Sequence, residues 1–454
     1  METFLKGLLL SSLSLMVCNN WEAMAAPAPA PSAAACAETK SKNIFWVDCY
    51  GAIAGDTNDD SAAIEEAIQE SHKVPAAVVL FTAGKYLVSR PINGTGAHLS
   101  GLPAASATGR GSIISVMPNL ALPITAVIEV KGRPALIDNL KILAESRAET
   151  AITLSDIPGP LTVLKSLQLG GALRAGLRVQ RVLGLSLLGV FIVSSGKMGF
   201  EFRESGQVYG RDLSTQSNQA WGFWIEGDYP TSVVDGSDTN FLAGYHFVHG
   251  DIEKNLNGAI YILNVRRKSE LEYFWIENGG TPVIVDSSQN LRLSHMRAVG
   301  AVVMNPPNYV MRVIGNTTNC IFEHLSFLGS SIPILPTDTA LQKKQKNDRY
   351  IDHHQVKIDP LAHDNLFYGI SHATTNFATN IQIQPESRNT ALSGVLYTLP
   401  SNIQLNAGLL QWLDHKPIDQ LGWPGDVIFV NQEMLACPKT SYNTPELGCK
   451  WQPH

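Results

Sequence analysis

The stretch that decides the fold runs from Val47 to Pro91 and reads VDCYGAIAGDTNDDSAAIEEAIQESHKVPAAVVLFTAGKYLVSRP. Gly51 and Gly55 supply turn geometry. The acidic residues that follow suit the start of a helix as capping and turn residues; they are Asp56, Asp59 and Asp60. Apolar side chains then recur at helical spacing, at Ala63, Ile64, Ala67 and Ile68. The stretch therefore predicts a turn, a short helix that covers an apolar surface, and a strand.

This order of elements resembles the N-terminal entry of the pectate-lyase superfamily. The pattern of that family runs approximately GA-x-GD-x-x-x-DD-x-x-A-I-x-x-A-I and then v-x-f-P-x-G-x-Y. Residues 51–68 match its first part, and Phe81–Tyr86 matches its second, with Thr82 and Ala83 where the family usually has Pro-Ala or similar. The resemblance implies a right-handed parallel β-helix and a carbohydrate substrate, and it does not name a reaction.

The middle of the chain carries a degenerate repeat. Gly199–Phe202, Gly222–Ile225 and Gly258–Tyr261 align at intervals of 23 and 36 residues, and Thr281–Val285 continues the series. Short strands at such a period are typical of a parallel β-helix. A leucine-rich repeat would need fixed Leu and Asn positions, and a β-sandwich would need closer strands. We therefore predict an all-β fold, a single-stranded right-handed parallel β-helix (solenoid) over residues 43–410 with a short N-terminal capping helix.

Two insertions interrupt the predicted coils, near 227–240 and 333–354. Extra residues in one coil must leave the stack as a surface loop, and such loops often border a binding groove. The second insertion is strongly polar, and we interpret it as a solvated excursion. We expect residues 411–454 to cap the C-terminal end, where strand edges would otherwise be unpaired.

The start of the chain reads as a secretory signal peptide over residues 1–25. Lys6 precedes the apolar run Gly7–Val17, and Ala23–Ala25 offers a cleavage site. The run is too short to span a bilayer comfortably, so we expect a secreted or periplasmic protein with no integral membrane segment after signal removal. Lipidation at Cys18 is the alternative, although Val17 suits that cleavage poorly. Residues 26–42 form an Ala/Pro-rich spacer, flexible or polyproline-like.

Export would permit disulfide bonds. Cys437 and Cys449 bracket a short loop and are predicted to pair, and Cys36 and Cys49 would tie the N-terminal arm to the first strand. Cys320 is left over inside an apolar run and is expected to be a buried free thiol. The Cys and His spacings do not suggest zinc.

The overall charge excludes one class of partner. The formal net charge is −6 and only 16% of the residues are charged, with Lys and Arg scattered along the chain. A basic footprint for nucleic acid is therefore missing from the sequence. A polysaccharide is the partner we expect, and the sequence leaves the oligomeric state open.

The densest group of polar and aromatic residues runs from Trp221 to Glu277, beside the first insertion. Strand alternation turns Asp251 and Glu253 outward together, about 7 Å apart. The candidate catalytic residues of this segment are Asp251, Glu253, Arg266, Glu272, Glu277 and His249. The candidate substrate-binding residues are Trp221, Trp224, Asp228, Tyr229, Arg267 and Lys268.

Two reactions fit these residues. A β-eliminating lyase needs a base and a cation, either Ca²⁺ or Arg and Lys, and the basic run Arg266–Lys268 near paired acids favours this reading. A glycoside hydrolase needs two carboxylates at a defined separation. The polygalacturonases of this superfamily are matched only by His249-Gly250, and the alginate epimerases only by an interrupted Asp359–Asp364. We predict cleavage of an acidic or decorated polysaccharide by β-elimination, with the hydrolase second and a non-catalytic polysaccharide binder or adhesin third. The sequence makes no cofactor certain, and Ca²⁺ is possible for a lyase.

Overall fold

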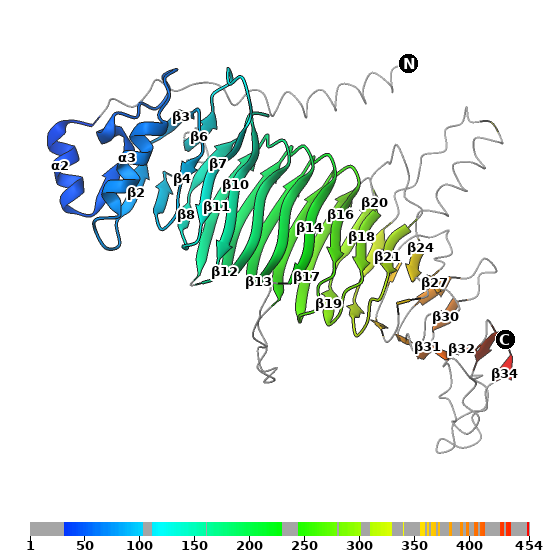
Figure 1. The fold of residues 1–454 in the computed structure, drawn as a ribbon. Coiled ribbons are helices and arrows are strands. Elements are labelled where there is room, and N and C mark those ends of the chain that lie inside the picture. The colour runs from blue at the N-terminus through cyan, green and yellow to red at the C-terminus, as the bar shows by residue number, and fades with distance from the viewer. Residues whose placement is uncertain are drawn as a thin grey trace.

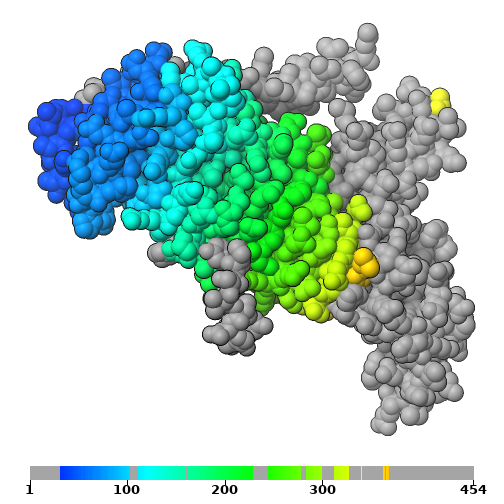
Figure 2. Space-filling view, viewed as in Figure 1, coloured from blue at the N-terminus to red at the C-terminus, as the bar shows by residue number. Residues whose placement is uncertain are grey.

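The protein is an all-β, right-handed parallel β-helix with short helices at its N-terminal end, as predicted (Figure 1). The computed structural model describes residues 31–102, 111–159, 161–228, 244–278, 281–300 and 309–328, residue 339, and shorter stretches between 355 and 453. The successive coils stack along one axis, so the molecule is elongated, and Figure 2 shows its outer surface from the same side.

Each coil adds one strand to a B sheet and two short strands to an A sheet, which we call its first and second rows. The B sheet contains β4 (Ile92–Asn93), β7 (Ile124–Lys131), β10 (Ala148–Ile157), β14 (Trp221–Asp228), β16 (Gly258–Leu263), β18 (Thr281–Asp286), β21 (Tyr309–Ile314), β24 (Gln355–Ile358) and β27 (Ile381–Ile383). The first A row contains β1 (Ile44–Trp46), β2 (Val78–Phe81), β5 (His98–Gly101), β8 (Leu136–Asp138), β19 (Leu291–Ser294), β22 (Ile321–Glu323), β25 (Leu366–Tyr368) and β28 (Ala391–Ser393). The second A row contains β3 (Gly84–Val88), β6 (Ser112–Val116), β9 (Leu140–Leu143), β20 (Arg297–Gly300), β23 (Ser326–Leu328) and β26 (Ser371–His372).

Five longer strands turn a corner and join these rows. Those that cross both A rows are β11 (Thr162–Gly170), β15 (Tyr245–Glu253) and β17 (Ser269–Asn278). The other two, β12 (Ala175–Val193) and β13 (Met198–Gln216), begin in the B sheet and continue through both A rows. The sheets therefore share one continuous interior.

The predicted repeat is the inner register of the B sheet. Phe200 pairs with Phe223, which pairs with Ile260, and Val283 follows. The rings of Phe200 and Phe223 stack at 4.5 Å between centroids, and both side chains are fully buried. Each coil thus covers the inner face of its neighbour, which is the source of cooperative stability in solenoids.

One residue per coil turns the chain between the two A rows, and it has a positive φ. These residues lie in register and form what we call the corner column: Asn139, Ser166, Gly189, Asp212, His249, Tyr273, His295 and His324. Their side chains point outward where they are exposed, so this corner forms an edge of the solenoid.

Helix α3 (Ser61–Ser71) covers the first coil with Ile64, Ala67 and Ile68, all buried, as expected from the opening stretch. Asp59 caps it by accepting a hydrogen bond from the Ser61 backbone N–H at 3.0 Å. Asp60 differs from the expectation because its carboxylate does not cap the helix. It accepts the backbone N–H groups of Ile53 and Leu87, at 2.9 and 2.8 Å, and so binds two loops together.

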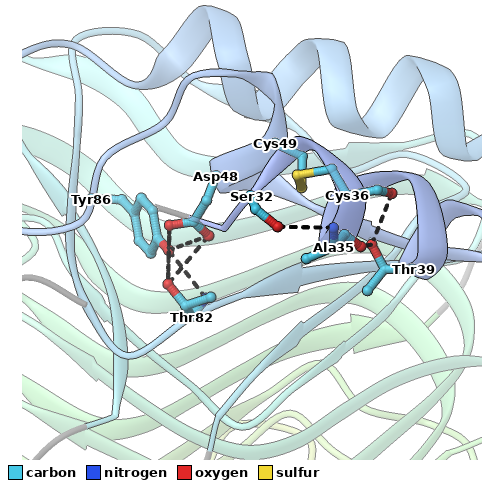
Figure 3. The surroundings of a disulfide bond; sticks show 8 residues. All are labelled: Ser32, Ala35, Cys36, Thr39, Asp48, Cys49, Thr82 and Tyr86. Carbon is cyan, nitrogen blue, oxygen red and sulfur yellow. Dashed lines mark hydrogen bonds between the residues drawn. A yellow bond between two sulfur atoms is a disulfide. The ribbon is translucent and has the colours of Figure 1, made fainter. Parts of the chain in front are cut away.

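The Phe81–Tyr86 motif also has a structural role (Figure 3). The Tyr86 hydroxyl donates to the Asp48 carboxylate at 3.0 and 3.1 Å, and Thr82 Oγ1 donates to the same group at 3.1 and 3.2 Å. Burial raises the pKa of Asp48. Thr82, which departs from the family pattern, therefore supplies a hydrogen bond that a proline could not donate.

Part of the predicted spacer is ordered. Helix α2 (Ala33–Ser41) begins at Ser32, whose hydroxyl accepts the Ala35 N–H at 3.2 Å. A run of alanines favours a helix, and the Cys36–Cys49 disulfide, which was predicted, fixes this helix against the 3₁₀ turn η1 (Val47–Tyr50) (Figure 3). Cys320 is a buried free thiol, as expected, and burial raises its pKa to about 11.

Several predicted segments lie outside the described residues. These are the signal peptide (1–25), nearly all of both insertions, and the Cys437–Cys449 pair. Parallel pairing from coil to coil in the first A row reaches β28. The tail that follows contains β29 (Leu396–Thr398), β30 (Gln404–Asn406), β31 (Leu409–Leu413), β32 (Val427–Val430), β33 (Glu433–Ala436) and β34 (Gln452–Pro453). The pairs β28–β31, β29–β30, β32–β33 and β33–β34 are antiparallel, and the pair β31–β32 is parallel. In the part of the chain that the structure describes, no helix has the length and apolar character to cross a membrane.

The buried Asp60 carboxylate predicts a pH-dependent stability. Burial raises its pKa from 3.8 to about 6. When the pKa of a carboxyl group is higher in the folded state than in the unfolded state, its protonated form stabilises the fold. This stabilisation is complete at a pH below the pKa of the unfolded state, and it is lost as the pH rises through the pKa of the folded state. The free energy of unfolding of the wild type, relative to that of Asp60→Asn, should therefore fall by about 3 kcal/mol between about pH 4 and pH 6.

Urea unfolding of both proteins across this pH range measures the difference. If the difference in the free energy of unfolding stayed constant, or grew with pH, the two N–H donors would lower the pKa of Asp60 more than burial raises it. The carboxylate would then stay ionised in the folded protein.

Candidate functional site

The structure divides the candidate residues between two faces of the solenoid. Trp221, Trp224 and Asp228 lie on β14 of the B sheet. The residues of β15 and β17 lie on the A sheet; they are His249, Asp251, Glu253, Glu272 and Glu277. Tyr229 lies outside the described residues. A single groove does not collect the whole predicted set, because β14 lies in the B sheet whereas β15 and β17 lie in the A sheet.

The outer surface of the B sheet, which we call the B face, holds a cluster of arginines around one carboxylate. The Glu201 side chain is fully buried, and Arg174 donates two hydrogen bonds to it, at 2.6 and 2.8 Å. Arg203 Nε donates a third at 2.6 Å. Arg178 lies beside the same carboxylate at 3.9 Å, and its Nε is buried without a hydrogen-bond partner among the described residues. One anion is thus shared by three guanidiniums.

The pKa values of both Glu201 and Arg178 are shifted downward in this cluster. Burial alone would raise the pKa of Glu201, but hydrogen bonds and charges from Arg174 and Arg203 lower it. The pKa of Arg178 is lowered by its own burial and by the neighbouring charge of Arg174, with smaller contributions from Arg203 and Arg181. Arg178 is therefore the least neutralised cation of the cluster.

An aromatic group adjoins the arginines. Trp224 is paired in register with Glu201, and its ring stacks on Tyr261 with centroids 4.5 Å apart and an angle of 6° between the planes. Trp221 meets the edge of Tyr261 at 5.1 Å and is only 9% exposed. Trp224 Nε1 donates to Glu226 at 3.0 Å, and Glu226 lies 3.3 Å from Arg203. Rings and guanidiniums therefore form one connected surface.

The second A row gathers three of the predicted carboxylates. Glu253 and Glu277 are directly paired between β15 and β17, and Asp251 lies two residues before Glu253 on the same outer face. Burial and the charge of Glu277 raise the pKa of Asp251, and burial, Asp251 and Glu277 raise that of Glu253. Asp251 Oδ1 is buried and has no hydrogen-bond partner in the described part of the chain. Neighbouring negative charges raise the pKa of a carboxyl group because each one disfavours the ionisation of the next.

The other predicted residues lie apart from this group. Glu272 is on the first A row, 3.7 Å from Arg292, and His249 is in the corner column with its Nδ1 3.6 Å from Asp212. Asp228 accepts the backbone N–H groups of Arg266 and Arg267, at 2.6 and 3.4 Å.

The basic run Arg266–Lys268 precedes β17 and so lies at the other end of that strand from Glu277. Lys268 lies 3.7 Å from Glu270. The predicted basic run therefore does not form the arginine cluster. That cluster lies on the B face and consists of Arg174, Arg178 and Arg203.

A metal site is not evident in the described ranges. Among those residues, no group of three or more His, Cys, Asp or Glu side chains has an arrangement that could hold an ion. Dependence of a lyase activity on Ca²⁺ stays a prediction.

Sequence reasoning missed Arg174, Arg178, Glu201, Arg203 and Tyr261. A signal was available, because Arg178, Glu201 and Trp224 are neighbours in the B sheet and follow one another at the repeat interval of 23 residues. Grouping outward residues by coil position, rather than by nearness in the chain, would have found the cluster.

Comparison with known proteins supports the fold. No curated protein sequence matches the chain. The family model described as rhamnogalacturonase A/epimerase, pectate lyase-like, matches residues 44–115, which include the opening stretch. The match to this family model and the observed parallel sheets indicate the same fold, so the chain has a pectate-lyase-like β-helix fold.

Several solved structures are similar. The A-module of the mannuronan C-5 epimerase AlgE4 from Azotobacter vinelandii is 14% identical, with a TM-score of 0.51 over 77% of this chain and 100% of that chain. The A-module of AlgE6 from the same organism is also 14% identical, with a TM-score of 0.51 over 77% and 98% of the two chains. The Dettilon tailspike protein is 9% identical, with a TM-score of 0.51 over 79% and 74%. At these identities the likeness concerns the fold alone.

The coupling of the three carboxylates predicts a titration experiment. Replacement of Glu277 by Gln removes a negative charge that raises the pKa values of Asp251 and Glu253, so both values should fall toward their ordinary range. Carbon-13 NMR of labelled carboxyl groups measures them. Glu66→Gln, on the exposed side of α3, is the matched control and should leave both unchanged. Unaltered pKa values in Glu277→Gln would show that the charge of Glu277 does not perturb this group.

Proposed function

We propose that this protein is an exported, carbohydrate-active enzyme that cleaves an acidic polysaccharide on its B face by β-elimination. The observation that carries the proposal is the sharing of one buried carboxylate, Glu201, by three guanidiniums beside the stacked rings of Trp224 and Tyr261. A cluster of this kind binds anions, and the adjacent rings suit the apolar face of a sugar.

β-Elimination makes two demands on a site. A base removes the proton from the carbon next to the uronate carboxylate, a double bond forms there, and the glycosidic oxygen leaves with the bonding electron pair. Negative charge builds up on the carboxylate during this step, so cations that are already in place stabilise the transition state.

The B face offers groups for both demands. Arg174 and Arg203 are held by Glu201, so their remaining N–H donors are positioned to neutralise a uronate carboxylate. Arg178 approaches Glu201 only to 3.9 Å, and its pKa is shifted downward, which is the direction that a base requires; on both grounds we assign the proton abstraction to this residue. Glu201 is a positioning residue, because it is buried beneath the guanidiniums and touches the substrate only through them.

The comparisons support a carbohydrate substrate in a coarser way. The matching family model is described as a rhamnogalacturonase A/epimerase, and two of the similar structures are epimerases of mannuronan. Export is supported by the Cys36–Cys49 disulfide, because such bonds persist in oxidising compartments.

Hydrolysis is the second candidate function, and a specific observation favours it. Asp251, Glu253 and Glu277 are neighbouring carboxylates, and the pKa values of Asp251 and Glu253 are raised, which is what a general acid needs. This reaction would take place on the second A row, not on the B face. A non-catalytic binder is the third reading, and the same assays test it.

The elimination proposal is tested by product chemistry. Incubation of the purified protein with polygalacturonate and alginate should give products whose unsaturated end absorbs ultraviolet light. Arg178→Ala should lower the turnover number by a factor on the order of 10²–10⁴, the usual contribution of a proton-transferring group. Arg147→Ala removes an exposed arginine outside the cluster and is the matched control. Reducing ends without the absorbance, or an Arg178→Ala variant with full activity, would contradict the assignment.

The hydrolase candidate is tested with the carboxylate variants. Asp251→Asn and Glu277→Gln should leave the formation of unsaturated product unchanged if elimination occurs on the B face. If either variant abolishes cleavage while Arg178→Ala retains it, the reaction belongs to the second A row. Binding without any product from either polymer would favour the third reading.

A further inference from the structure

Four consecutive coils carry an aromatic ring in the corner column, and we call these residues the ring row: His249, Tyr273, His295 and His324. The ring centroids are separated by 5.4, 4.6 and 4.9 Å, and the last two contacts are stacked. The row therefore runs parallel to the axis of the solenoid, with a step of one coil.

The ring row is exposed, unlike the aromatic stacks of the core. Tyr273 is 47% exposed and the His249 side chain 51%, and His295 and His324 are also exposed. Because the rings of Tyr273, His295 and His324 stack along the axis, they present their edges to solvent. These edges carry imidazole nitrogens and a phenol hydroxyl, which are hydrogen-bonding groups.

The corner itself does not require rings. Asn139 and Gly189 occupy the same column on earlier coils, and these residue types tolerate a positive φ better than tyrosine does. Tyr273 has a φ of 59°, an unfavourable conformation for a bulky residue. Tyr273 thus carries a conformational cost that the turn does not explain.

A pocket opens at the start of the ring row, between it and the first A row. It has a volume of about 480 Å³, and it is lined by Leu188, Tyr209, Gly210, Arg211, His246, Val248, His249 and Tyr273. Two imidazoles in it face carboxylates: His249 Nδ1 lies 3.6 Å from Asp212, and His246 Nδ1 lies 3.3 Å from Glu270. The pocket thus combines aromatic and aliphatic side chains with oriented polar groups, which is the usual make-up of a small-ligand site.

We propose that the pocket and the ring row form a second polysaccharide-binding site that does not take part in cleavage. One sugar unit would lie in the pocket against Tyr209 and Val248, and the chain would continue along the ring row, where successive ring edges meet successive sugar hydroxyls. The site lies on the A sheet and the proposed cleavage on the B face, so the two share only the class of ligand.

The chemistry of this site differs from that of the B face. Recognition relies on hydrogen bonds from ring edges and on packing of an apolar sugar face, so it depends little on the charge of the glycan. Binding there should be weakly affected by salt, whereas binding to the arginine cluster should weaken as salt screens the charges.

Binding is measured by native affinity electrophoresis of the full chain in gels that contain alginate, polygalacturonate or dextran. The test variants are Tyr273→Asn and His295→Asn, because asparagine keeps the positive φ and removes the ring. Each should weaken binding to long chains by about 2- to 10-fold, as for the loss of one hydrogen bond, and in high salt as well as low. Cleavage of short oligosaccharides should be unchanged.

Ser194→Asn is the matched control, because Ser194 is exposed, has a φ of 57° and lies outside the ring row. Equal affinities in the ring variants and the control would overturn the proposal, as would lower melting temperatures of the ring variants with unchanged affinity, which would make the rings purely structural. The readout is binding, so it stands even if no cleavage is found on the B face.

Discussion

Every coil of this protein buries its inner side chains only because the next coil lies over it in register. Phe200, Phe223 and Ile260 illustrate the rule, since each is fully buried by its neighbours above and below. The same register fixes the outside of the molecule, because the outward side chain next to a buried one in a strand stands in a column with its counterparts on other coils, as Glu201 does with Trp224. The side chains on the outer surface therefore lie in columns that run along the axis, with one residue from each coil. Both the arginine cluster and the ring row are columns or pairs of columns of this kind.

This organisation explains what the sequence could predict and what it could not. The opening stretch and the glycine-marked repeat were enough for the fold, because turn residues, helix spacing and strand period are local properties. The site required knowledge of which residues share a face. Trp224 and Asp251 are near in sequence but lie on different sheets, whereas Arg178 and Glu201 are a full coil apart and lie side by side. The insertion after β14 changes the spacing of one coil, which also hid the contact between Asp212 and His249.

The role of Glu201 depends on its burial. An unpaired buried carboxylate is costly, and breaking such a pair by removing one partner typically costs about 3–5 kcal/mol. Glu201 meets this cost with hydrogen bonds from two arginines, and in doing so it holds their side chains against the sheet. Guanidiniums that are already held in place lose little freedom when an anion arrives, which is the preorganisation that binding and transition-state stabilisation both need.

The covalent link between α2 and η1 sets a direction for assembly. Domains emerge from synthesis with the N-terminal part first, and the Cys36–Cys49 loop, with a sequence separation of 13, lies almost wholly ahead of the first coil. Once it closes, α2 and α3 complete one end of the stack and leave a single growing end, toward which each new coil is added. The strands of the first coil are thereby closed to pairing on their N-terminal side and offer only the other side to the next coil.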